Sequence, residues 1–172
     1  GTVSGTSISF GTPAVFENNN NQVGDLAFDS NSNKVVIPYV DNNVDGTNYG
    51  TVVIGTVSGT NITFGTPVTF ATSYTSSYLS ATFDSSSNKV LVVHANNGSS
   101  YAGTAVVGTV SGTSISFGTA FVYTSNSAYT TYIGRGSVFD SNSNRVVATY
   151  VDGSNSNYGT AVVISTAETN LT

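Results

Sequence analysis

The chain has 172 residues, of which only 8% are charged, and its formal net charge is −5 at pH 7. With only 4 Lys and Arg residues, no basic surface for a nucleic-acid backbone or an anionic membrane is available. No apolar run approaches the ~18–20 residues of a membrane span. The chain has no Cys, which excludes disulfides and thiolate metal sites. Val, Ile, Phe and Tyr supply much of the hydrophobic content, which predicts an all-β protein.

One segment occurs three times along the chain. GTVSGTSISFGTP begins at Gly1, GTVSGTNITFGTP at Gly55 and GTVSGTSISFGTA at Gly108. Two other segments recur in constant order with it, FDSNSNKVV from Phe28 and NYGTVVIG from Asn48. A unit of roughly 53 residues is too small to bury both faces of a sheet alone, so neighbouring units must pack against one another.

Each unit reads as four short strands separated by polar turns. In the first complete copy these strands are residues 25–30, 33–41, 49–59 and 61–70. Turn signals about 8–12 residues apart are typical of sandwiches, barrels and propellers. We expect Asp29 to accept backbone hydrogen bonds from residues further along its turn, and Gly59 to supply the positive φ of the following hairpin.

The chain begins inside one unit and ends inside another. Residues 1–16 hold the end of a unit, whereas the last unit lacks its fourth strand. We therefore predict a β-propeller-like array of three four-stranded antiparallel repeats, in which residues 1–16 complete the last blade and leave no edge unpaired. A β-trefoil is the alternative. Because propellers have about 4–8 blades, three repeats predict a homo-oligomer or part of a longer array.

The predicted domain boundaries follow from these landmarks. Residues 1–165 form a single repeat domain, with repeats at about 17–70, 71–123 and 124–165. Residues 166–172 are interpreted as an exit segment towards a further C-terminal region.

The motifs VVGTVSGTSISFGT, FDSNSNKVV and NYGTAVV together resemble a tandem repeat of structural and tail-associated proteins of marine phages and some bacteria. The resemblance covers residues 1–165 and implies an exposed adhesive or structural role. It carries no functional residues onto this chain. The hairpin SGTSISFGTP is also similar to the Asp-box hairpin of sialidase-like propellers, but it lacks the Asp and so supports only a blade hairpin.

No catalytic residues are predicted. The only histidine, His94, aligns with Tyr39 and Tyr150 of the other repeats, which favours a structural aromatic position. A Ser-His-Asp triad needs a carboxylate to orient the histidine, and the second repeat offers only the turn residue Asp84. We expect no enzyme activity. A sialidase-like glycosidase is the alternative, and it would require a carboxylate pair and a Tyr nucleophile at one channel mouth.

The segment DNNVDG partly matches a calcium-binding loop. Asp41, Asn43 and Asp45 offer oxygen ligands, and Gly46 occupies the turn position. Val52 stands where the closing bidentate Glu should be. These residues are a candidate calcium site, with a solvated loop as the alternative, and no other cofactor is predicted.

Tyrosines gather beside Ser and Asn in the loops between strands. Aromatic faces next to amide and hydroxyl groups suit sugar stacking or protein adhesion, and they also cap sheet ends. An arginine in the third repeat is placed to hold an anionic sugar or carboxylate, with an ion pair as the alternative. The predicted ligand-binding residues are Tyr74, Tyr78, Tyr129, Tyr132 and Arg135.

These patterns predict an extracellular or virion-surface module that binds a glycan or protein surface. Its partners are not expected to include nucleic acid or a membrane. A fibre or shell assembly protein is the alternative function.

Overall fold

The structure, a computed structural model, describes residues 2–19, 22–42, 48–72, 75–96, 98, 101–125 and 136–166. These residues lie mainly in strands and turns, and none of them is in an α-helix. The described part of the chain therefore contains no helix long and apolar enough to span a membrane. The predicted all-β class with antiparallel sheets is confirmed.

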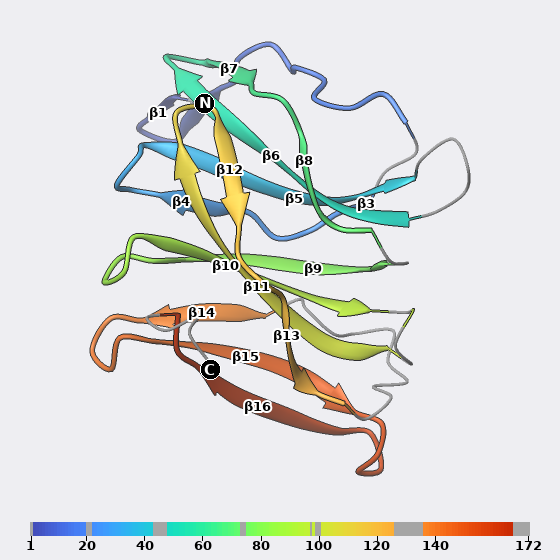
Figure 1. Ribbon diagram of the computed structural model, residues 1–172. Coiled ribbons are helices and arrows are strands. Elements are labelled where there is room, and N and C mark those ends of the chain that lie inside the picture. Colours follow the sequence, from blue (N-terminus) through green and yellow to red (C-terminus); the bar gives the residue numbers. More distant parts are fainter. Residues whose placement is uncertain are drawn as a thin grey trace.

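Each repeat forms its own antiparallel sheet, and Figure 1 shows the three sheets stacked face to face. A hairpin of β1 (Thr2–Ser4) and β2 (Ser7–Ser9) comes first. The first sheet contains β3 (Gln22–Val23), β4 (Ala27–Asp29), β5 (Lys34–Asn42), β6 (Asn48–Ser58), β7 (Asn61–Phe64) and β8 (Val68–Ala71). The second contains β9 (Thr75–Asp84), β10 (Lys89–Asn96), β11 (Ala102–Ser111), β12 (Ser114–Phe117) and β13 (Phe121–Thr124). The third contains β14 (Ser137–Asp140), β15 (Arg145–Asp152) and β16 (Tyr158–Ile164).

The fourth strand of each complete repeat is divided into two short strands. β7 and β8 both pair with β6, and β12 and β13 both pair with β11, with a register shift within the β8 and β13 pairings. The named strands pair only within one repeat, and an isolated parallel bridge between Asp25 and Ser80 connects the first two repeats. These strands therefore do not build the single barrel, shared by three repeats, of the β-trefoil alternative.

The N-terminal hairpin does not complete the third sheet within one chain. Among the described strands, β1 pairs only with β2, and β16 pairs only with β15. The segment after the hairpin lies instead against the first sheet. Phe16 packs on Tyr39 and Phe64, and Gly11 approaches the backbone of Thr60. Within the described chain, the first and second sheets thus separate the expected partners, the hairpin and β16 (Figure 1).

An aspartate closes the turn between the first two strands of each repeat. Asp29 Oδ1 accepts hydrogen bonds from the backbone N–H groups of Asn31 and Ser32, at 2.9 and 3.1 Å. Asp84 and Asp140 accept the equivalent bond from the residue two positions on, at 2.8 and 2.9 Å. A residue with positive φ follows in all three turns: Asn33, Asn88 and Asn144. The turn chemistry expected from the sequence is confirmed.

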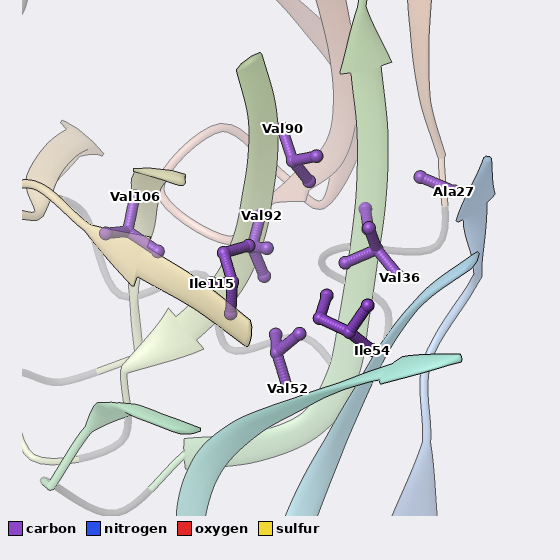
Figure 2. Close-up of a cluster of buried hydrophobic side chains, with 9 residues drawn as sticks. Ala27, Val36, Val52, Ile54, Val90, Val92, Val106 and Ile115 are labelled. Carbon is purple, nitrogen blue, oxygen red and sulfur yellow. The ribbon is translucent and has the colours of Figure 1, made fainter. Parts of the chain in front are cut away.

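The hydrophobic core lies between the sheets. Figure 2 shows valine and isoleucine side chains from the first and second sheets meeting at their boundary. Alternate residues of β10 contribute to different clusters: Val90 and Val92 pack towards the first sheet, and Leu91 and Val93 pack with the third. The run VLVV after Lys89 is continuously apolar because the second sheet is covered on both faces.

The first strands of the three repeats form a column through the stack. β9 contacts β4 on one side and β14 on the other. Asp25 donates its backbone N–H to the carbonyl of Leu79 at 3.0 Å and accepts from Ala81 at 3.1 Å. On the other side, Ser80 and Thr82 form hydroxyl hydrogen bonds with Ser137.

Leu91→Ala tests the boundary between the second and third sheets. Leu91 is fully buried, so truncation should lower the free energy of unfolding by about 2–5 kcal/mol. Val122→Ala is the control, because Val122 is 55% exposed and its truncation should change stability by about 0.5 kcal/mol or less. Urea denaturation measures both values. Equal losses would contradict a core located between the sheets.

Candidate functional site

Most predicted ligand-binding and calcium residues lie outside the described part of the chain. This applies to Tyr74, Tyr129, Tyr132, Arg135, Asn43 and Asp45, and to the side chain of Tyr78. The backbone of Tyr78 belongs to β9, and Asp41 lies in β5. The structure therefore does not bring the predicted set together, and its members stay predictions.

The strand ends divide the stack into two different edges. At one edge, the aspartate turns join the first and second strands of each repeat. At the other edge, β5 meets β6 at Asn42 and Asn48, and β10 meets β11 at Asn96 and Ala102. β15 meets β16 there in the same way. The sequences between these strand ends differ between repeats, whereas the aspartate turns are nearly identical.

His94 is buried within the stack. Its side chain is 1% exposed, and its ring packs on Phe70 in an edge contact with centroids 5.2 Å apart. Its Nδ1 atom is buried without a hydrogen-bond partner. Burial lowers the pKa of His94 to about 4, against a smaller opposing contribution from the backbone at Ala95. The ring is therefore neutral at physiological pH and is shielded from a substrate in solution.

The aligned tyrosines have the same structural role. Tyr39 is fully buried against Phe16, and Tyr150 packs against Tyr123 with ring centroids 5.8 Å apart. Burial raises the pKa of Tyr39 above its usual range, with smaller contributions from Glu17 and Asp41. Burial also raises the pKa of Tyr123. Both phenols therefore stay protonated at neutral pH, as packed aromatic groups.

Asp41 and Glu17 form a small acidic group beside Tyr39. Burial raises the pKa of Asp41, and the charge of Glu17 raises it further. Asp41 Oδ1 is buried without a hydrogen-bond partner, while Glu17 Oε1 accepts from the backbone of Asn18 at 2.8 Å. Among the described residues, no group of three His, Cys, Asp or Glu side chains is placed to hold a metal ion. Of the predicted calcium site the structure describes only Asp41, and Glu17, which was not part of that prediction, lies near it.

A glycine–aromatic contact that sequence reasoning missed recurs in the stack. Phe70 covers Gly50 of its own sheet, and Tyr123 covers Gly103: a Cβ on either glycine would lie 2.5 Å from the ring. We call the position over each such glycine a ring site. The available signal was the YG or AG pair that begins the third strand in every copy.

The equivalent ring site of the third sheet is open. A Cβ on Gly159 would meet no atom within 4 Å. A cavity of about 400 Å³ lies beside it, lined by Gly136, Thr149, Tyr150, Val151, Gly159, Thr160 and Ala161. The described chain leaves this ring site without an aromatic side chain.

Replacing His94 tests its neutral, buried state. The folded-state pKa of about 4 lies below the unfolded value of 6.5, so the unfolded chain binds the proton more tightly. The stabilising contribution is complete above pH 6.5 and decreases as the pH falls to about 4, by up to about 3 kcal/mol. Unfolding free energies measured across this range should fall less steeply in His94→Phe. Parallel profiles for the two proteins would contradict this assignment.

Asp41→Asn tests the acidic pair. The folded state favours protonated Asp41, so its contribution to stability decreases as the pH rises from 3.8 through the raised pKa. At neutral pH without calcium, the neutral amide should therefore raise Tm. If calcium binds at Asp41, added calcium should raise the Tm of the wild type more than that of the variant. Equal responses to calcium would exclude Asp41 as a ligand.

Comparison with known proteins gives no family assignment. No family model, curated protein or solved structure matches the chain.

Proposed function

We propose that the chain is a non-enzymatic binding module of β-propeller-like repeats, exposed on a virion or cell exterior. The column formed by β4, β9 and β14 supports the propeller-like arrangement, because the first strands of successive blades lie side by side around a propeller axis. The proposed partner is a glycan or a protein surface. Contacts are made at the edge where β5, β10 and β15 end.

The difference between the two edges of the stack carries this proposal. The aspartate turns read DSNSNK, DSSSNK and DSNSNR, and the same hydrogen bond from the residue two positions on closes them. Between paired strand ends, the opposite edge carries DNNVDGTNY, NNGSSYA and DGSNSNY, which differ in length or composition. Variable loops on a constant scaffold are a common arrangement of binding sites. Their Tyr, Asn and Ser residues suit contacts with sugar hydroxyls.

The buried state of His94 supports a non-enzymatic role. A general base must come within about 3 Å of the proton that it removes, and His94 is 1% exposed. The described carboxylates at Asp29 and Asp84 are also buried, and they accept hydrogen bonds within their turns. The two carboxylates thus stabilise the turns in which they lie.

Assembly is the second candidate function, and exposed apolar side chains on the two outer sheets favour it. Leu26 and Phe28 of the first repeat are 58% and 55% exposed, and Val138 and Val163 of the third are 62% and 65% exposed. Equivalent positions at the internal boundaries are covered by the adjacent sheet.

A glycan array tests the binding proposal. The wild type should bind at least one glycan class, and Tyr78→Ala and Tyr132→Ala should each weaken binding by about tenfold or more, because stacking contacts are lost. Ser85→Ala is the matched control, since Ser85 is exposed at the aspartate-turn edge. Absence of binding by folded wild-type protein on a broad array would contradict the glycan form of the proposal.

A further inference from the structure

The boundary between the first and second sheets contains a complete aromatic contact. Phe70 occupies the ring site over Gly50 and reaches two rings of the next sheet. Its centroid lies 5.2 Å from that of His94 and 5.5 Å from that of Phe117. A complete contact therefore has four parts: a glycine, the ring that covers it, and two rings of the following repeat.

The boundary between the second and third sheets lacks one of these parts. Tyr123 covers Gly103, and it contacts Tyr150, the counterpart of His94. The counterpart of Phe117 would belong to a fourth strand of the third sheet. The described third sheet ends at β16 and supplies no such ring.

The contact at the N-terminal segment has the rings but lacks the glycine. Phe16, the counterpart of Phe70, lies 5.3 Å from Tyr39 and 5.6 Å from Phe64, measured between ring centroids. No described preceding sheet supplies a glycine beneath Phe16. Phe10, the counterpart of Phe117, is 77% exposed although it belongs to the same repeated motif.

A second set of contacts repeats this pattern. Cβ atoms on Gly11 and Gly65 would collide with the backbone of Thr60 and Thr113, the hairpin threonines of the following repeat. Gly118 is the next glycine in this series, and its nearest neighbour would be the Val107 carbonyl oxygen at 3.8 Å. The threonine that is missing there has its counterpart in the exposed β1–β2 turn, at Thr6.

We propose that copies of this chain associate head to tail, with residues 2–17 of one copy completing the third sheet of a second copy. Phe16 then covers Gly159 of the second copy, and Phe10 completes the contact of Tyr123 with Tyr150. The internal interfaces already show every part of this junction. The association does not depend on ligand binding at the loop edge.

The internal register places the added strand. β13 pairs with β11 through Gly103 and Thr124, Thr104 and Val122, and Ala105 and Phe121. The equivalent pairing sets residues 14–17 of one copy beside Gly159–Ala161 of the other. Leu26 and Phe28 of the first copy come to face Val138 and Val163 of the second, which removes exposed apolar surface at both ends.

Ile164 occupies the position that the hairpin isoleucine of an added strand would take. Equivalent positions hold Gly55 and Gly108, where a Cβ would lie 2.9 and 2.7 Å from the hairpin residues Ile62 and Ile115. Ile164 is 5% exposed and packs in the core where a hairpin isoleucine would lie. Ile8 of the incoming copy competes for this place, so Ile164 must move.

Two variants disable opposite ends of the junction without removing buried contacts. Gly159→Val fills the open ring site, and Phe10→Ser changes a ring that is 77% exposed. Ser85→Val is the control, because it adds valine at an exposed position in the aspartate turn between β9 and β10 and leaves both ring sites unchanged. Sedimentation velocity over a concentration series gives the mass of each protein. Circular dichroism and Tm verify that each variant remains folded.

The wild type and Ser85→Val should form species of at least twice 17.6 kDa as concentration rises. Each junction variant should raise the dissociation constant by about tenfold or more. An equimolar mixture of Gly159→Val and Phe10→Ser should form dimers again, because one intact junction remains between them. A monomeric wild type at every concentration, unchanged association of the variants, or a mixture that stays monomeric would each overturn the proposal. If monomeric Gly159→Val still binds glycans, the association proposal and the binding proposal can be judged independently.

Discussion

The structure depends on covering a sheet that is apolar on both faces. In the second sheet, Val90 and Leu91 are adjacent in sequence and fully buried in different clusters. Successive strand residues point to opposite faces, so this strand requires a sheet on each side. The strands within a sheet satisfy one another's backbone groups, whereas the neighbouring sheets exclude water. A single repeat has no second sheet to do this, which explains why the unit recurs.

Close packing between repeats explains the glycines within strands. Glycine weakens a strand, because it adds no packing side chain and loses more backbone entropy on folding. A side chain at Gly50 or Gly103 would collide with the aromatic ring of the same sheet that lies directly over each backbone. The ring then reaches the following sheet, so one contact connects two levels of the stack. His94 and Tyr39 fill the same place in this contact, since it requires a flat ring and makes no use of a titrating group.

Much of the fold was predictable from the sequence. The repeated landmarks indicate the strand order, and Asp29 and Gly59 indicate the turn chemistry, because both effects are local. The position of residues 1–16 was not predictable, since strand propensity does not specify which sheet a hairpin packs against. The ring sites also escaped prediction. The register shift in the β6–β8 pairing lies between Gly50 and Thr51, and periodicity alone does not reveal such a shift. The candidate ligand residues belong to sequence segments that differ between repeats, where no repeated pattern constrains them.

The hydroxyl groups in the strand column have a consequence for folding fidelity. Near-identical repeats in one chain invite wrong sheets to pair, a common failure of repeat proteins. Buried Ser80 and Thr82 bond to Ser137 at one boundary, whereas the other boundary places Ala27 and Ala81 in one apolar cluster. Exchanging partners between these boundaries would leave buried hydroxyls facing alanine, at a cost of about 1–3 kcal/mol for each unpaired group. These buried hydroxyl groups thus help each copy of the repeat to pair with its correct neighbour during folding.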